Sequence, residues 1–149
     1  EYCNRQGDEI TDVVGVYETE EIKLLSHVKS PGNILELGAC LGVVSVITNH
    51  EIVTGGDQVH TVVEANPDLI PYLMRNRRNN SCNFNIINGL VSKTSKGDFW
   101  SYDKIVAGSA DRLDKREKNK THHKVPVCQL EELSQTAFNT LIIDIEGEI

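Results

Sequence analysis

The feature that most constrains this chain is a pair of segments, residues 33–42 (NILELGACLG) and residues 62–67 (VVEANP). Each segment is typical of a short apolar strand that ends at an acidic residue, Glu36 or Glu64, and then turns. The first turn contains two glycines four positions apart and leads directly into an apolar helical pattern. A strand–turn–helix unit of this kind predicts an α/β fold in which glycines let a ligand approach the backbone.

The spacing of acid and glycines indicates which ligand such a turn suits. A dinucleotide site uses Gly-x-Gly-x-x-Gly, because a pyrophosphate lies on the N–H groups of a helix N-terminus. Here the pattern is Glu36-x-Gly38-x-x-x-Gly42, and Cys40 stands in place of the middle glycine. A carboxylate at this point repels a pyrophosphate but suits the ammonium group of a methionine moiety. The pattern therefore favours S-adenosylmethionine over a nicotinamide cofactor, with Glu64 accepting hydrogen bonds from the ribose hydroxyls; a plain structural corner is the alternative.

The rest of the chain alternates between strand and helix patterns. Helices are expected from about residue 20, from residue 43 and over about 71–78, with a short one over 130–133. Strands are expected over 34–37, 59–64, 84–87 and 141–145, the last an apolar run that suits a strand buried on both faces. Strands over 98–102 and 124–128 flank a polar loop and predict an inserted antiparallel hairpin. This order predicts one α/β domain over residues 1–149, with a mostly parallel sheet and helices on both faces.

Composition excludes several classes of function. The net charge of −7 over 149 residues argues against a nucleic-acid partner, which would need a basic face. No apolar run is long enough to span a membrane. The four cysteines lie far apart, without Cys-x-x-Cys or neighbouring histidines at ligand spacing, so we expect no metal site and reduced thiols in a cytoplasmic protein.

Over residues 16–147 the chain resembles the FkbM family of S-adenosylmethionine-dependent methyltransferases. The shared motifs, in chain order, are Val16-Tyr17-Glu18, the glycine motif, residues 63–67, the Asn76…Asn79-Asn80 helix end, residues 87–92, residues 125–127 before 130–133, and Ile143-Asp144-Ile145-Glu146-Gly147. The closing Asp-x-Glu-Gly is the most specific of them. The resemblance implies a class I (Rossmann-like) methyltransferase fold that acts on hydroxyl oxygens of small molecules or glycans. Such a fold usually has three more strands, so we expect a sheet cut off after its fourth core strand, whose open edge invites association with another copy.

Site residues follow from the two acids and from the resemblance. The cofactor-binding set, which covers the methionine, ribose and adenine parts of the ligand, is Glu36, Leu37, Gly38, Ala39, Gly42, Glu64, Ala65, Asn66, Asn88, Gly89 and Leu90. Asp144 or Glu146, after the last strand, is expected to take the proton of a hydroxyl acceptor, or else to cap a helix or contact the ammonium.

Three histidines are further candidates for the base, but each is expected to have a structural or solvated role instead. His60 falls within a strand and is expected to be packed, whereas His122 and His123 are expected in a solvated loop. Trp100 and Tyr102 are expected to pack the hairpin on the sheet, with lining of an acceptor pocket as the alternative.

Three functions stay open at this stage. The first is methyl transfer from S-adenosylmethionine to a hydroxyl oxygen. The second is a remnant that binds this cofactor without turnover and acts through association. The third is a nicotinamide-dependent oxidoreductase, which the missing middle glycine and Glu36 disfavour.

Overall fold

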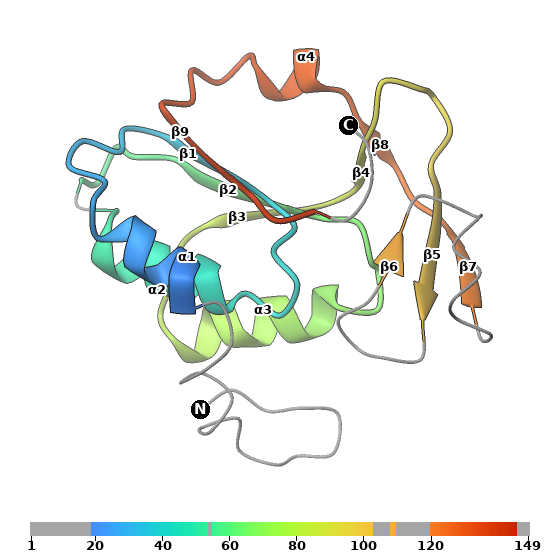
Figure 1. Cartoon of the computed structure of the whole chain (residues 1–149), viewed down its shortest axis with the longest axis horizontal. Coiled ribbons are helices and arrows are strands. Elements are labelled where there is room, and N and C mark those ends of the chain that lie inside the picture. Colours follow the sequence, from blue (N-terminus) through green and yellow to red (C-terminus); the bar gives the residue numbers. More distant parts are fainter. Residues whose placement is uncertain (1–18, 54, 103–107, 110–119, 146–149) are drawn as a thin grey trace.

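The computed structural model describes residues 19–53, 55–102, 108–109 and 120–145 (Figure 1). Its helices are α1 (Thr19–Leu25), α2 (Val43–Glu51), α3 (Ile70–Asn79) and α4 (Leu130–Leu133). Its strands are β1 (Ile34–Leu37), β2 (His60–Glu64), β3 (Asn85–Asn88), β4 (Leu90–Val91), β5 (Asp98–Tyr102), β6 (Gly108–Ser109), β7 (Lys120–Lys124), β8 (Val127–Cys128) and β9 (Thr140–Ile143). The described part of the chain is thus a mixed α/β structure, as the alternating patterns predicted.

A four-stranded parallel sheet, in the order β3-β2-β1-β9, forms the centre of this structure. Ile34 lies opposite both His60 and Thr140, so β1 and β2 end close to the same level and β9 runs alongside. Because parallel strands place their carboxyl ends at one edge, the turns that follow β1, β2 and β9 gather there.

Alternation along the strands divides the core between the two faces of this sheet. Helices α1, α2 and α3 lie on one face and α4 on the other (Figure 1). The first face carries two buried clusters, one around Val62, Leu73 and Phe84 and one around Leu25 and Ile34. The second face carries a cluster of Leu35, Leu37, Val63 and Cys128, against which Leu133 and Phe138 pack. Helices therefore cover both faces, as predicted.

The predicted antiparallel hairpin is present, but its second strand was wrong. β5 pairs antiparallel with β7 over Lys120–Lys124, not with residues 124–128, and also pairs with β6. Residues 127–128 instead form β8, which runs parallel to β4. Backbone hydrogen bonds between strands do not require apolar side chains, so the polar residues 120–124 can form a strand of a partly exposed sheet. Because these residues lack an apolar pattern, the sequence did not indicate this strand.

Two further expectations need correction. β3 covers residues 85–88 rather than 84–87, because its pairing with β2 runs from Asn85 opposite Thr61 to Asn88 opposite Glu64; Phe84 packs in the core just before it. β9 is not buried on both faces: Leu141 is 55% exposed and Ile143 is 48% exposed. β9 pairs only with β1 among the described strands, and α4 covers its outer face incompletely.

None of the described helices combines the length and the apolar character that crossing a membrane would require.

Candidate functional site

The glycine turn between β1 and α2 has an unusual backbone. Gly38 (φ 89°), Cys40 (φ 50°) and Gly42 (φ 86°) all lie in the left-handed region, and Gly42 is the N-cap residue of α2. The N–H groups of Gly38 and Ala39 donate to the carbonyl oxygen of Val63 at 2.9 and 3.3 Å. The turn therefore folds over the end of the neighbouring strand β2 instead of extending into solvent.

Steric contacts explain why Gly38 and Gly42 are glycines. A Cβ at Gly38 would overlap the carbonyl oxygen of Asp144 and lie 2.8 Å from its carbonyl carbon. A Cβ at Gly42 would overlap the side chain of Leu73 on α3. The two glycines therefore allow close packing within the protein itself: Gly38 packs against the backbone after β9, and Gly42 packs against α3.

Glu64, at the carboxyl end of β2, holds this turn in place. One carboxylate oxygen (Oε2) accepts the backbone N–H of Cys40 at 2.7 Å, and the other (Oε1) accepts the backbone N–H of Asn66, also at 2.7 Å. The side chain thereby links the glycine turn to the turn that follows β2. Its exposed fraction is 7%, so these two charge-assisted bonds form in a largely desolvated place.

The environment of Glu64 changes its acidity. Burial raises the pKa of Glu64 above its ordinary value, and hydrogen bonds from the N–H groups of Asn66, Cys40 and Ala65 oppose this without overcoming it. Repulsion from the negative charge of Glu36 adds to the rise. The two acids are therefore close enough to influence each other across the end of the sheet.

Glu36 lies under the turn, pointing to the same face of the sheet as Val62. Its exposed fraction is 2%. Ser45 Oγ, in the first turn of α2, donates to Glu36 Oε1 at 2.7 Å, and His60 Nε2 lies 3.2 Å from Glu36 Oε2. The burial of His60 confirms the prediction that it is a packed residue. Its hydrogen-bond partner is Glu36, which the sequence analysis assigned to cofactor binding.

A small cavity joins Glu36 to the end of β9. It measures about 10 Å³, and the described residues that line it are Glu36, Leu37, Gly38, Ala39, Val44, Ile142 and Asp144. A cavity of this size holds about one water molecule. It can therefore receive a group the size of an ammonium, whereas a nucleoside would have to lie outside it.

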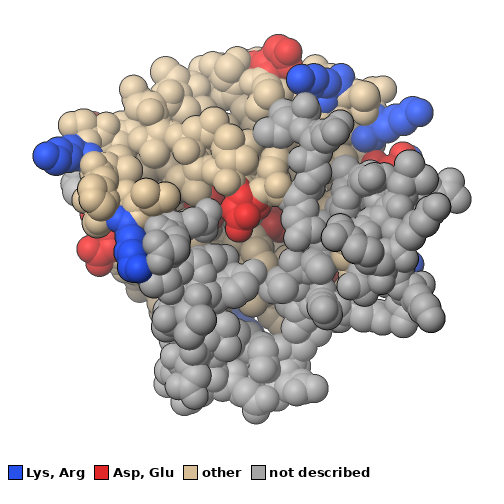
Figure 2. Space-filling model, in the orientation of Figure 1, with Lys and Arg blue, Asp and Glu red and all other residues tan. Residues whose placement is uncertain are grey.

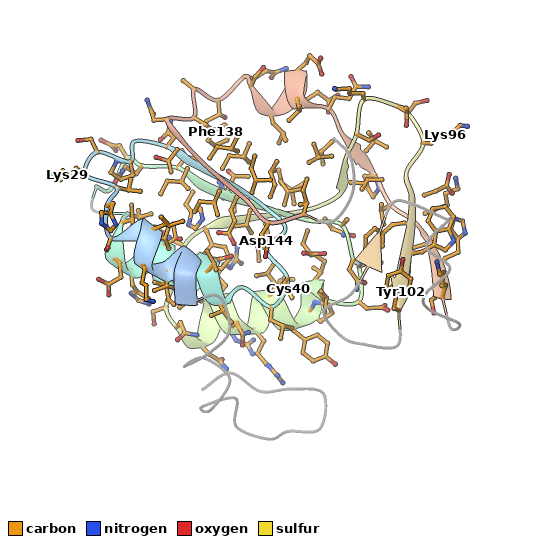
Figure 3. All side chains as sticks on the ribbon, in the orientation of Figure 1. Lys29, Cys40, Lys96, Tyr102, Phe138 and Asp144 are labelled. Carbon is orange, nitrogen blue, oxygen red and sulfur yellow. The ribbon has the colours of Figure 1, made fainter. Side chains whose placement is uncertain are left out.

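Asp144 stands at the mouth of this region. It is exposed, and its backbone N–H donates to the carbonyl oxygen of Leu37 at 2.9 Å, which extends the β1–β9 pairing. Figure 3 labels Asp144 and Cys40 at the same end of the sheet. Figure 2 shows acidic side chains in the middle of the drawn face and others toward its edges, where the Lys and Arg side chains also lie. Glu146 lies outside the described residues.

The remaining predicted residues lie beside Glu64. Asn88 Nδ2 donates to the carbonyl oxygens of Glu64 and Ala65 at 2.8 and 3.3 Å, and the N–H of Gly89 donates to the same Glu64 oxygen at 3.0 Å. The N–H of Leu90 donates to the carbonyl oxygen of Pro126 at 2.8 Å. The structure thus brings these residues together with Glu64 at one edge of the sheet, since β3 and β2 end at the same level.

The histidine pair was placed wrongly. His122 and His123 lie in β7 rather than in a loop, and the side chain of His123 is only 13% exposed. His123 Nε2 is 2.7 Å from the hydroxyl of Ser101 and 3.9 Å from a carboxylate oxygen of Asp68, in the turn after β2. The contact with Asp68 links the sheet of β5, β6 and β7 to the carboxyl edge of the central sheet, beside which Figure 1 shows it. Tyr102 is buried, in keeping with a packing role.

Three residues that support the site were missed from the sequence: Ser45, His60 as a partner of Glu36, and Asn76. Asn76 Nδ2 donates to the carbonyl oxygen of Leu41 at 2.8 Å and ties the glycine turn to α3. Strand alternation could have indicated His60, because residues 60, 62 and 64 share one face. Within the described residues, no group of three His, Cys, Asp or Glu side chains is arranged to hold a metal ion.

Comparison with known proteins gives distant structural matches. No family model and no curated protein matches the sequence. The solved structure of putative transferase PH0793 from Pyrococcus horikoshii matches at 18% identity with a TM-score of 0.37, covering 48% of this chain and 27% of that one. The PH0226 protein from Pyrococcus horikoshii OT3 matches at 17% identity with a TM-score of 0.42, covering 64% of this chain and 42% of that one. The chain thus spans less than half the length of either protein.

Proposed function

We propose that this chain binds S-adenosylmethionine and transfers its methyl group to a hydroxyl oxygen of a small molecule or glycan, as the resemblance to the FkbM family implies. The observation that carries the proposal is the position of Glu64. Its carboxylate lies at the end of β2, holds the N–H of Cys40 in the glycine turn, and stands beside a second acid, Glu36, of the adjacent strand. Two buried acids at adjacent strand ends suit a ligand that carries both a diol and an ammonium group.

The donors and acceptors present fit such a ligand. A carboxylate has about four acceptor positions, and the backbone N–H groups of Cys40 and Asn66 occupy two of those on Glu64. The backbone N–H of Ala65 also donates to this carboxylate, so about one position would remain for a ribose hydroxyl. Ala65 and Asn66 would flank the adenosine, and Asn88, Gly89 and Leu90, held beside Glu64, would meet the adenine.

The methionine end would lie against the glycine turn. Leu37, Gly38 and Ala39 line the water-sized cavity together with Glu36, and Gly42 begins α2. Glu36 would face the ammonium group from within that cavity. The described residues that line it include two acids and no Lys or Arg, which favours a cation over the pyrophosphate of a dinucleotide.

When bound, S-adenosylmethionine supplies an activated methyl group on its sulfonium. The contribution of the chain is then to position the acceptor and to accept its proton. Asp144, exposed at the end of β9 and adjacent to the cavity, is the described carboxylate placed for this role; Glu146 is the second candidate from the sequence.

The test is a binding measurement followed by a transfer assay. Isothermal titration calorimetry of the full chain with S-adenosylhomocysteine is expected to show one binding site. Glu64→Gln should weaken the binding at least about tenfold, because one of two acceptor oxygens becomes a donor facing an N–H group. The matched control is Glu51→Gln, an exposed acid in the last turn of α2, which should bind like the unchanged chain.

Two results would overturn the proposal. One is the absence of binding heat with folded protein. The other is equal binding by the Glu64→Gln and Glu51→Gln variants. If binding is found, tritium transfer from labelled S-adenosylmethionine to a panel of sugars and hydroxylated metabolites tests the second half of the proposal. Asp144→Asn should then reduce transfer by a much larger factor than it weakens binding of S-adenosylhomocysteine.

A second candidate function has its own observation. Leu141 and Ile143 on β9 are about half exposed, which is unusual for neighbouring apolar side chains of one strand. A chain that binds the cofactor without turnover and associates along β9 would bury them. Cofactor binding without transfer, together with a dimer that Ile143→Lys dissociates in analytical ultracentrifugation, would favour this candidate.

A further inference from the structure

A buried polar cluster surrounds the carboxylate of Glu36. It consists of Glu36 on β1, Ser45 on α2 and His60 on β2, and we refer to it as the Glu36 cluster. All three residues are at most 3% exposed. Polar groups at this depth are costly unless each is hydrogen-bonded, so the arrangement needs a physical explanation.

The hydrogen bonds of the cluster all converge on the carboxylate. Ser45 Oγ donates to Glu36 Oε1 at 2.7 Å, and His60 Nε2 meets Glu36 Oε2 at 3.2 Å. A carboxylate only accepts, so His60 must carry a hydrogen on Nε2. His60 Nδ1, in contrast, is buried and has no hydrogen-bond partner among the described residues.

The surroundings of His60 are otherwise apolar or neutral. Its ring lies 5.4 Å from the ring of Phe84, at an angle of 55°, between strand and helices. Thr48, one turn after Ser45 on α2, is fully buried and its hydroxyl also has no partner among the described residues. Glu36 is therefore the acidic side chain that His60 contacts among the described residues, and this contact leaves His60 Nδ1 without a hydrogen bond.

The cluster leaves Glu36 with a defined open side. Two of its roughly four acceptor positions are taken by Ser45 and His60, and Glu36 is one of the residues that line the cavity with Gly38 and Asp144. Its negative charge acts beyond the cluster, since it contributes to the raised pKa of Glu64. A buried carboxylate held by two side-chain donors is fixed in orientation, so its remaining acceptor positions face one direction.

We propose that His60 is a positioning residue that fixes the Glu36 carboxylate so that it faces the ammonium-bearing end of the cofactor. The inference rests on the proposed function and deepens it. It assigns a role in ligand selectivity to His60, which would help the site to distinguish ligands that carry an amino-acid tail from ligands that lack one. His60 acts through Glu36 and touches no reacting atom. A purely structural His60 would affect all ligands of the site alike.

The experiment compares two ligands that differ only in that tail. S-adenosylhomocysteine carries the ammonium group, and 5′-methylthioadenosine keeps the nucleoside but lacks it. In the full chain, His60→Leu should raise the Kd of S-adenosylhomocysteine about tenfold, as expected for losing a hydrogen bond to a charged group, and leave the Kd of 5′-methylthioadenosine within about twofold. His27→Leu, an exposed histidine at the end of α1, is the matched control and should change neither.

A second pair of variants keeps the test decisive if His60→Leu does not fold. The amide nitrogen of Gln can occupy the place of Nε2, whereas the shorter Asn cannot reach Glu36. His60→Gln should therefore keep the preference for S-adenosylhomocysteine, and His60→Asn should lose it.

The outcomes separate the two proposals. If the unchanged chain binds neither ligand, the proposed function fails. If it binds both, and the His60 variants weaken both equally or neither, the proposed function stands and the positioning role of His60 is refuted. A selective loss for S-adenosylhomocysteine supports the role.

Discussion

Replacing Gly38 by alanine tests the geometry of the glycine turn directly. Gly38 has φ 89°, a conformation that costs an L-residue about 1–2 kcal/mol. In addition, the new Cβ would overlap the carbonyl oxygen of Asp144 and lie 2.8 Å from its carbonyl carbon and 3.0 Å from Ile145 Cγ2. Backbone cannot move aside as a flexible side chain does, so the join between β1 and β9 must shift, at a cost comparable to overpacking a core, about 1–3 kcal/mol.

The expected loss is therefore about 2–5 kcal/mol of unfolding free energy, a large part of the stability of a typical domain. The matched control is Gly56→Ala, since a Cβ there meets nothing within 4 Å and Gly56 has no positive φ. That variant should stay within about 0.5 kcal/mol of the unchanged chain.

The assay is urea unfolding followed by circular dichroism. The free energies of unfolding of the unchanged chain and the two variants are compared, provided that their m-values agree. If Gly38→Ala and Gly56→Ala unfold within about 0.5 kcal/mol of each other, the close approach of Gly38 to Asp144 is not a feature of the protein in solution, and the argument from it fails.

Three more predictions concern stability. Leu73→Ala should lose about 2–5 kcal/mol in urea unfolding because Leu73 is fully buried, whereas Met74→Ala, half exposed on the same helix, should lose less than about 1 kcal/mol; similar losses would contradict the burial pattern. Asn76→Ala should lose about 1–3 kcal/mol in thermal unfolding, since the carbonyl of Leu41 is left without its 2.8 Å donor. Because burial raises the pKa of Glu64 above its ordinary 4.5, the folded state holds the proton more tightly than the unfolded state, and Glu64 lowers stability as pH rises from about 4.5 through the raised value. The stability of the unchanged chain relative to Glu64→Gln should therefore fall over this pH window in urea unfolding, and a rise would refute the direction.

Much of the fold was predictable from local sequence. β1, α4 and the boundaries of β5 agree with the local patterns of apolar and polar residues, and α3 begins one residue before the predicted Pro71. Such elements depend on neighbours in sequence, whose periodicity is visible in the chain itself. The pairing of residues 120–124 with β5 was not visible, because partner choice in a sheet depends on distant residues and the pattern there is polar throughout.

The exposure of β9 marks a different limit. Its apolar run is typical of a central strand, but burial depends on which layers cover it. α4 and residues 134–138 leave Leu141 and Ile143 about half exposed. The sequence of residues 140–143 gives no indication of this exposure.

For the candidate site, the sequence by itself determined that two acids would stand at the ends of neighbouring strands with a glycine turn between them, because parallel strands joined through a helix bring their carboxyl ends to one edge. Only the tertiary structure decided what each acid does there. Glu64 binds the N–H of Cys40, and Glu36 turns inward to Ser45 and His60. These contacts join residues 9 to 24 positions apart, and their geometry is set by how α2 packs on the sheet, which no spacing along the chain specifies.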